Sequence, residues 1–260
     1  MKAIVLGAGY ATRLRPLTDS VPKMLLPLAG RPMLDYLIER IEAVDEIDEI
    51  HVVTNARFAG DFGRWAGQRS GMRPVNVWND GTTSNEDRLG AIGDIRFTVE
   101  EAGLAGADLL VVAGDNLIEY SLDDFVRFWR EKDEGAAIAV HRVADLDLIK
   151  QYGVVELDEN DRVVSLAEKP SEPRSDLAAT AAYLYRAEHA GLIGLYLDAG
   201  NPPDAPGNFV VWLYPRAPVY GYRFEGGWMD IGDPQQLLEA DNRMRARLGL
   251  EARAEYSLTP

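Results

Sequence analysis

The sequence predicts an α/β fold: a Rossmann-like mixed, mostly parallel sheet flanked by helices, with a small antiparallel lobe. Three observations carry this prediction. Short apolar runs alternate with helical patterns over residues 1–134, closely spaced strands follow over 135–232, and a helix and tail occupy 233–260. Alternating strands and helices are typical of a parallel sheet with crossover connections. Closely spaced strands favour antiparallel pairing.

The elements of the first half follow from hydrophobic periodicity. The apolar run 3–7 ends at a glycine and predicts a buried strand, as do the runs 50–54, 75–78 and 109–113. Residues 33–44 follow Pro32 and carry apolar side chains at helical spacing, which predicts a helix. Residues 86–102 predict a second helix with an apolar face. Because parallel strands end at the same edge of a sheet, the loops after residues 7 and 113 should face one crevice.

The second half begins with a helix at 121–132, which Ser121 can cap. The segments 136–143, 153–157, 163–167 and 178–185 predict strands with little helix between them. Residues 197–208 are rich in Pro, Gly and Asp and predict a loop, and 219–224 predicts another strand. A last helix over 234–248, capped by Asp233, should turn Leu237, Leu238, Met244 and Leu248 inward.

Composition excludes several classes of protein. The chain has 260 residues, no cysteine and three scattered histidines, so disulfides, thiolate chemistry and a zinc site are not expected. Any metal should be a hard cation bound by carboxylates. The net charge is −15 without a basic stripe, which argues against a nucleic-acid partner. We find no membrane-spanning run and no signal peptide, so we expect a cytoplasmic location and no membrane partner. A homo-oligomer is compatible with the sequence.

The first loop has the residue types that bind phosphate. Gly7 and Gly9 leave backbone N–H groups accessible, and Arg13 and Lys23 add positive charge near them. A dinucleotide-binding fingerprint would need a third glycine where Thr12 stands. A plain strand-to-loop connection with surface arginines, including Arg15, is the alternative.

Two aspartates are candidates for binding Mg²⁺. Asp115 and Asp230 each follow an apolar segment at a turn, and Mg²⁺ usually takes one or two protein carboxylates and completes its shell with water and phosphate. For Asp115 a turn or helix-capping role is equally compatible. The Glu168-Lys169 pair and the Tyr152-Gly153 pair are ordinary surface features when each is taken alone.

Taken together, the order Arg13-x9-Lys23, Gly-Asp115-Asn, Tyr152-Gly-Val, Glu168-Lys-Pro and Trp-Met-Asp230 resembles the sugar-1-phosphate nucleotidyltransferases. These are NDP-sugar pyrophosphorylases such as the glucose-1-phosphate thymidylyltransferases. The resemblance covers residues 1 to about 233. It implies a GT-A-like fold in one domain, with a nucleotide-binding part at 1–134, a sugar-phosphate-binding part at 135–232 and a C-terminal helix and tail at 233–260.

The resemblance also implies the reaction: transfer of NMP from an NTP to a sugar 1-phosphate, with pyrophosphate leaving and Mg²⁺ as cofactor. Arg13 and Lys23 are the implied catalytic residues, and Asp115 and Asp230 the implied metal ligands. The expected nucleotide-binding residues are Leu6, Gly7, Ala8, Gly9, Thr12, Asn79, Thr82, Asn85 and Gly114. The expected sugar-phosphate-binding residues are Asn116, Tyr152, Gly153, Glu168, Lys169, Tyr183 and Trp228. In-line attack by a phosphate oxygen needs no general base, so the lack of a histidine or cysteine nucleophile is no obstacle.

Three segments depart from the family pattern. The first loop reads Gly-Tyr10-Ala11-Thr where many relatives have Gly-Ser-Gly-Thr, and we derive no role for the tyrosine. Residues 78–87 replace the family's base-reading Gln-x-x-Pro-x-Gly segment, with Thr82 and Asn85 as candidate readers and a polar turn with Ser84 or Asn85 as helix cap as the alternative. Residues 204–208 lack the charged segment that thymidylyltransferases use for the sugar phosphate. Neither the base nor the acceptor is therefore fixed.

Other functions stay open at this level. One is a cytidylyltransferase acting on choline or inositol phosphate, and another is an inactive nucleotide or sugar-phosphate sensor. A Rossmann oxidoreductase is disfavoured by Thr12 and by the lack of an acidic residue after a second strand. The sequence shows no hexapeptide repeat, so we expect no fused acetyltransferase.

Overall fold

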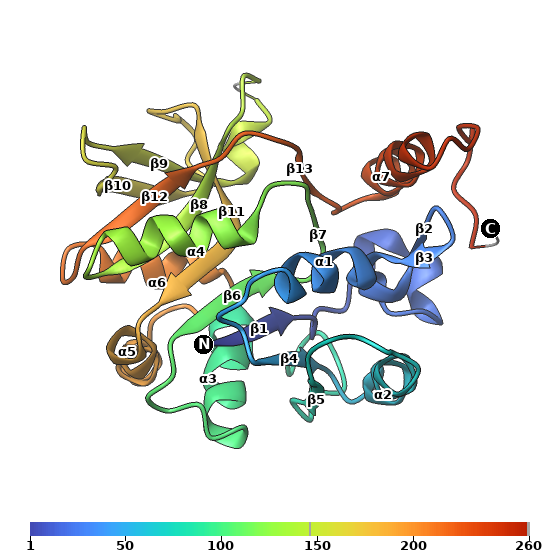
Figure 1. Cartoon of the computed structure of the whole chain (residues 1–260), viewed down its shortest axis with the longest axis horizontal. Helices are drawn as coiled ribbons and strands as arrows, with labels where there is room; N and C mark the ends of the chain where they lie inside the picture. The colour runs from blue at the N-terminus through green and yellow to red at the C-terminus, as the bar shows by residue number, and fades with distance from the viewer. Residues whose placement is uncertain (146, 259–260) are drawn as a thin grey trace.

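The computed structural model describes residues 1–145 and 147–258. A mixed nine-stranded sheet is built in this part of the chain, with the order β10-β9-β11-β6-β1-β4-β5 and with β8 paired to β11 and β12 (Figure 1). Its strands are β1 (Lys2–Leu6), β4 (Glu49–Thr54), β5 (Val75–Asn79), β6 (Leu109–Ala113), β8 (Ala136–Arg142), β9 (Gly153–Leu157), β10 (Val163–Glu168), β11 (Leu177–Tyr185) and β12 (Val219–Arg223). The strands β6, β1, β4 and β5 pair in parallel, whereas β11 runs antiparallel to β6, β8 and β9. The predicted fold class is confirmed.

Two small sheets and seven named helices complete the described residues. The small sheets pair β2 (Pro27–Leu28) with β3 (Arg31–Pro32), and β7 (Asn116–Ile118) with β13 (Trp228–Asp230). The α-helices are α1 (Met33–Glu42), α2 (Ala59–Gly67), α3 (Ala91–Glu101), α4 (Leu122–Glu131), α5 (Ala187–Asp198), α6 (Pro206–Leu213) and α7 (Pro234–Arg247). Short 3₁₀ turns are η1 (Thr12–Leu14), η2 (Leu17–Asp19), η3 (Lys23–Leu25) and η4 (Ile149–Gln151).

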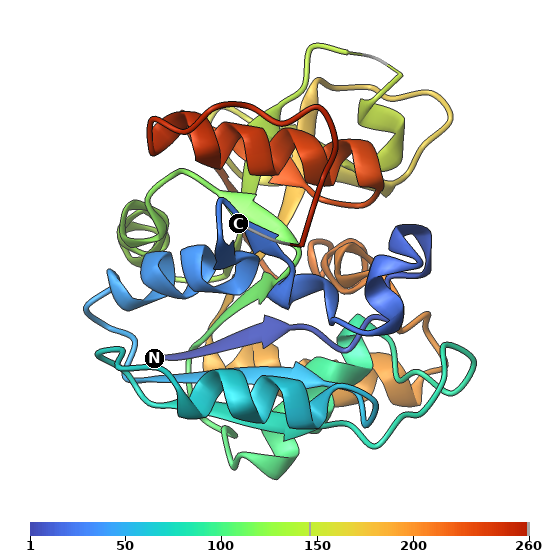
Figure 2. The same ribbon diagram turned by 90° about the vertical axis from the view of Figure 1, so that its right-hand side faces the viewer.

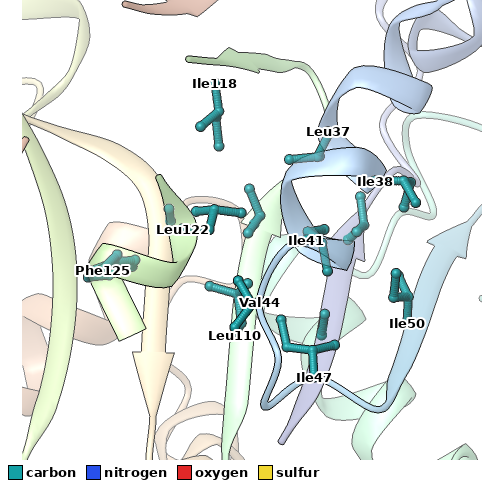
Figure 3. Packing of buried hydrophobic residues seen from close by; sticks show 14 of the residues in the cluster. Leu37, Ile38, Ile41, Val44, Ile47, Ile50, Leu110, Ile118, Leu122 and Phe125 are labelled. Atoms are coloured by element: carbon teal, nitrogen blue, oxygen red, sulfur yellow. The ribbon is translucent and has the colours of Figure 1, made fainter. Parts of the chain in front are cut away.

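Both faces of the sheet are buried. Alternate side chains of each strand point to opposite sides, so a single strand contributes to two cores. Ala3 and Val5 of β1 join a core with α1, α2 and α4. Ile4 of the same strand joins a second core with α3, α5 and α6. Figure 3 shows the first core, in which Leu37 and Ile41 of α1 face Leu110 and other side chains of the sheet. Among the described residues, no helix is long and apolar enough to cross a membrane.

The helix boundaries differ from the sequence prediction at one functionally important place. The helix expected at 86–102 begins only at Ala91. Gly90 has φ +79°, which is outside the helical region, so the helix starts after this residue. A Cβ there would lie 2.7 Å from the Pro203 carbonyl oxygen, so the turn requires glycine. The segment before it is a loop in which Asp87 accepts hydrogen bonds from the backbone N–H groups of Thr83 and Ser84. Neither Ser84 nor Asn85 caps the helix, since the N-cap is Gly90.

Other differences have equally simple causes. The helices α2 and α5 were not expected, because the glycines within each interrupt the helical pattern in the sequence. The loop expected at 197–208 ends at Pro206, where α6 begins with proline in its first turn. Leu248 lies past the end of α7 and is 57% exposed rather than inward. The caps expected at Ser121 and Asp233 are confirmed, since their side chains accept from the N–H groups of Asp124 and Gln236.

Candidate functional site

The first loop and Asp115 lie side by side, as the strand pattern predicts. Strands β1 and β6 are parallel neighbours, with Leu6 opposite Ala113 in the register. The backbone N–H of Gly114 donates to the Leu6 carbonyl, and that of Gly7 donates to the Val53 carbonyl. Figure 2 shows β1 and β4 ending at the same edge of the sheet. The two loops after these strands therefore share one edge, where ligands of such sheets bind.

Met24 fixes the position of Lys23 at this edge. Its buried side chain packs against Gly7 and Gly114, and a Cβ added at Gly7 would lie 2.5 Å from the Met24 sulfur. A Cβ at Gly114 would collide with the same side chain. These glycines are needed for close packing of η3 against the ends of β1 and β6. The sequence analysis missed Met24; its place directly after Lys23 was the only signal.

A chain of polar contacts runs from Lys23 to Trp228. Lys23 Nζ donates to Asp115 Oδ2 at 2.7 Å, Asn116 Nδ2 donates to Asp115 Oδ1 at 2.9 Å, and Trp228 Nε1 donates to Asn116 Oδ1 at 2.5 Å. Burial opposes ionisation of Asp115, but the Lys23 ammonium outweighs it and holds the pKa of Asp115 below its ordinary value. Both carboxylate oxygens are therefore oriented, and Asp115 is held ionised.

Asp230 reaches the same place from the other end of the chain. Strand β13 pairs with β7 so that Asp230 lies opposite Asn116, and the Ile231 N–H donates to the Asp115 carbonyl at 3.1 Å. Burial and the neighbouring Asp115 carboxylate raise the pKa of Asp230 to about 6. Two carboxyl groups that repel one another in this way fit a hard divalent cation, which takes oxygen ligands and removes the repulsion. Among the described residues no cluster of three or more metal-binding side chains occurs, so the protein would supply two ligands at most from such groups here.

Three cavities meet around Asp115, and each is named here after one residue in its wall. The Arg13 cavity, of about 160 Å³, is lined by Leu6, Gly7, Gly9, Ala11, Arg13, Lys23, Met24, Asp115 and Gly232. The Asp94 cavity, of about 400 Å³, has Leu6, Ala8, Gly9, Asn85, Arg88, Gly90, Ala91, Asp94, Asp115, Asp204 and Pro206 among its lining residues. The Glu168 cavity, of about 280 Å³, includes Asp115, Asn116, Tyr152, Gly153, Glu168, Lys169, Tyr183, Asp204, Gly207, Trp228 and Asp230.

The Glu168 cavity is built around one half-buried carboxyl group. A Cβ at Gly207 would lie 2.7 Å from Glu168 Oε2 and one at Gly153 would lie 3.1 Å from it, so both glycines leave room for this side chain. Burial raises the pKa of Glu168, against the effect of the neighbouring Lys169. Lys169 has φ +48°, a strained backbone for a residue with a side chain, and its N–H donates to the Tyr152 carbonyl. A carboxyl, an ammonium and the aromatic rings of Tyr152 and Trp228 thus line one cavity.

Most of the predicted site residues line these cavities, but four do not: Thr12, Asn79, Thr82 and Gly114. Asn79 accepts the Gly81 N–H in a turn, and Thr82 is 5% exposed and hydrogen-bonded to Asp80. Tyr10, to which we assigned no role from the sequence, is buried, and its hydroxyl donates to Thr82 Oγ1 at 3.3 Å. Tyr10 and Thr82 therefore join the first loop to the 80–87 loop from behind the cavities. Arg15 is exposed and paired with Asp19.

Sequence reasoning missed two charged groups of the Asp94 cavity. Arg88 Nε donates to Asp204 Oδ1 at 3.0 Å, so the loop before α3 and the segment before α6 are joined across 116 positions of sequence. Asp94 lies in the first turn of α3 and is 6% exposed. An acidic residue among the apolar positions of a helix was the available signal for Asp94. Nothing in the sequence pairs Arg88 with Asp204.

The fold and the site define an α/β protein that gathers a glycine-rich loop, cationic side chains and two carboxyl groups at the carboxyl edge of its sheet. A model of the nucleotidyl transferase family matches residues 2–247, and the chain belongs to this family. The resemblance expected from the motifs is confirmed at that level.

Two curated relatives illustrate the likeness. A putative mannose-1-phosphate guanyltransferase of Sulfolobus acidocaldarius is 30% identical over 240 residues, covering 92% of this chain and 61% of the relative. A glucose-1-phosphate thymidylyltransferase of Streptomyces antibioticus is 31% identical over 244 residues, covering 93% of this chain and 65% of the relative. The chain thus spans less than two thirds of the length of either relative.

A solved structure supports the fold. The crystal structure of a putative glucose-1-phosphate thymidylyltransferase from Bacillus anthracis, in complex with a sucrose, superposes with a TM-score of 0.77 at 24% identity. The superposition covers 94% of this chain and 95% of that one. It shows that the two chains share the nucleotidyltransferase fold.

Proposed function

We propose that this chain transfers a nucleoside monophosphate from a nucleoside triphosphate to a sugar 1-phosphate, giving an NDP-sugar and pyrophosphate. One observation carries the proposal: Asp115 lies in the wall of all three cavities. Ligands in the Arg13, Asp94 and Glu168 cavities would therefore meet at one carboxylate. Such a junction suits a reaction that joins two phosphate-bearing molecules.

In this reaction an oxygen of the sugar phosphate forms a bond to the α-phosphorus of the triphosphate. The bond from that phosphorus to the bridging oxygen of the β-phosphate breaks, and pyrophosphate leaves with the electron pair. The nucleophile is already an anion, so no proton has to be removed. The work of the protein is to align two like-charged reactants and to stabilise the charge on the transferring phosphorus.

The Arg13 cavity is the proposed place of the triphosphate chain. The Gly7 N–H is already bonded to the Val53 carbonyl, so the proposed phosphate donors in this cavity are the cations Arg13 and Lys23 and the loop at Gly9. Such groups are donors that match phosphate oxygens. Arg13 is proposed to stabilise the leaving pyrophosphate, and Lys23 the α-phosphate.

The Glu168 cavity is the proposed place of the sugar phosphate. Glu168 would accept hydrogen bonds from sugar hydroxyls, and Lys169 would bind the phosphate. Tyr152 and Trp228 offer aromatic faces to the sugar ring, with their own rings 5.0 Å apart in an edge-to-face arrangement.

Asp115 and Asp230 are the proposed ligands of Mg²⁺, on the strength of their adjacent carboxyl groups and the raised pKa of Asp230. When bound there, Mg²⁺ would neutralise phosphate charge. Lys23 would keep Asp115 ionised for this role, and Asn116 would keep it oriented. The relatives named above are guanyl- and thymidylyltransferases, which leaves the base to be determined for this chain.

The test is pyrophosphate release with Mg²⁺, measured for the ribonucleoside triphosphates and dTTP against sugar 1-phosphates, choline phosphate and inositol phosphate. Release that requires one sugar 1-phosphate supports the proposal, whereas release with choline or inositol phosphate alone replaces the acceptor. Triphosphate binding without release from any pair would favour the sensor alternative.

The matched variants are Arg13→Ala and Arg15→Ala. The first removes a cavity cation and should lower kcat/KM by about 100-fold or more, as the loss of a charge-stabilising donor does. The second removes an exposed arginine paired with Asp19 and should leave kcat/KM unchanged. Equal effects of the two substitutions would contradict the role given to Arg13.

A further inference from the structure

Two carboxyl groups face one another beside the Asp94 cavity without a cation between them. Asp94 stands on the first turn of α3 and lines the cavity, and Asp80 stands in the loop after β5, close enough for its charge to act on Asp94. Asp94 Oδ1 and Asp80 Oδ2 are both buried, and no donor of the described residues reaches either atom. Two negative charges that face one another in a buried site repel strongly. A single proton held between the two carboxyl groups removes this repulsion and gives both oxygen atoms a hydrogen-bond partner.

The surroundings of the pair leave it poor in donors. Asp80 Oδ1 accepts from the backbone N–H and the hydroxyl of Thr82, each at 2.7 Å. Among the described residues that line the cavity the one cation is Arg88, and it is paired with Asp204. With one proton shared, the pair keeps a net negative charge and presents acceptor oxygens.

The pair is also held rigidly. The Asp80 N–H donates to the Thr54 carbonyl at the end of β4, and the Ala56 N–H donates to the Thr82 carbonyl. Tyr10 holds Thr82 from the first loop. Asp94 itself is 6% exposed and contributes its side chain to the cavity wall. A preorganised acceptor in a cavity wall discriminates between ligands by the donors they bring.

We propose that Asp94, held by Asp80, selects a nucleotide whose base presents an exocyclic amino group to the Asp94 cavity, and rejects thymine and uracil nucleotides. This inference rests on the proposed nucleotidyl transfer and specifies its nucleotide. Guanine, adenine and cytosine carry an amino donor, whereas thymine and uracil present carbonyl oxygens at their 2 and 4 positions. The one donor on the pairing edge of thymine and uracil, N3–H, lies between these two carbonyl oxygens, so bringing it to the acid pair also brings a carbonyl oxygen against the acceptors of the pair, which is unfavourable in a buried site.

Two substitutions separate recognition from structure. In Asp94→Asn the amide nitrogen can donate to Asp80 in place of the shared proton, while the amide oxygen still accepts from the ligand. This variant should keep the preference of the native protein. In Asp94→Leu, which has a similar shape without polar atoms, the preference should fall by roughly 10- to 100-fold, the usual discrimination of one well-placed polar contact to a base. Asp94→Ala serves as the second variant if the leucine variant does not fold.

The experiment measures both the binding of GTP, ATP, CTP, UTP and dTTP by calorimetry and the release of pyrophosphate with each. We expect one nucleotide with an amino group on its base to bind at least tenfold more tightly than UTP and dTTP. Comparing the five nucleotides identifies that base. Glu101→Gln, at the exposed end of the same helix, is the control and should bind like the native protein.

Preferred binding of UTP or dTTP by the native protein would overturn the proposal, as would an unchanged preference in both Asp94→Leu and Asp94→Ala. Binding of none of the five nucleotides would overturn it as well. Selective binding of an amino-bearing nucleotide without pyrophosphate release from any pair would instead contradict the proposed transfer and leave the selectivity established.

Discussion

Replacing Asp94 by asparagine should change how the stability of the protein depends on pH. Burial, together with the charge of Asp80 and the hydrogen bond to it, raises the pKa of Asp94 from 3.8 to about 8. Between these two values the folded protein holds a proton that the unfolded chain releases. The stability that Asp94 contributes is therefore complete below pH 3.8 and is lost as the pH rises through about 8.

The size of the effect follows from the width of this window. Between pH 5 and pH 7 the unfolded carboxyl is ionised and the folded one is protonated, so the two states differ by about one proton. One proton corresponds to about 1.4 kcal/mol of unfolding free energy per pH unit, or about 3 kcal/mol over the two units. Asparagine does not titrate and can donate to Asp80. The advantage of Asp94→Asn over the native protein in unfolding free energy should therefore grow by about 3 kcal/mol from pH 5 to pH 7.

Urea denaturation followed by tryptophan fluorescence, at pH 5, 6 and 7, measures this difference. Glu101→Gln, whose side chain is exposed on the same helix, should run parallel to the native protein across the range. If the native protein and Asp94→Asn also run parallel, Asp94 does not hold a proton in the fold, and the reasoning about the acid pair is wrong.

Three further substitutions test the site and the scaffold. Asp115→Ala should lower turnover by about 1,000-fold or more. It should also lower the pKa of Asp230, because the neighbouring negative charge is gone. Near-native turnover would show that Asp115 takes no part in the chemistry, and circular dichroism checks that the variant folds. Gly114→Ala should lower the unfolding free energy by about 1–3 kcal/mol, because its methyl group collides with Met24; a native urea midpoint would show that Met24 can move aside. Asp233→Ala should cost about 1 kcal/mol by removing the cap on Gln236, and an unchanged thermal midpoint would speak against that cap.

The strand-and-helix alternation predicted the sheet and the edge at which Asp115 and the first loop meet. It did so because buried strands have a strong periodic signal and because parallel strands share an edge. The starts and ends of helices depended on particular backbone angles instead. The late start of α3 comes from Gly90, which has φ +79° and lies so close to the Pro203 carbonyl that a Cβ would collide with it, a contact that no local pattern reports.

The candidate site divides in the same way. The first loop with Arg13 and the turn with Asp115 follow buried strands and were predicted to share one crevice, whereas the role of Lys23 was implied by the family resemblance; the structure brings all three residues together in the wall of the Arg13 cavity. Contacts between distant segments were not predictable from periodicity. Asp94 was hidden in a helix that appeared ordinary, and its importance becomes visible only when Asp80 is found against it.

Strand β11 has a mechanical consequence for how the protein can move. Its pairing with β8 shifts register between Ala179 and Tyr183, and Ala181, at φ +53°, lines both the Asp94 cavity and the Glu168 cavity. On either side of this irregularity the same strand pairs with β9 and with β6. The two cavities thus share one strand of the sheet, and a hinge motion between them would have to break hydrogen bonds of that strand. The loop before α3 and the segment before α6 are joined at the wall of the Asp94 cavity by the salt bridge from Arg88 to Asp204, so a movement of one segment away from the other requires this ion pair to break.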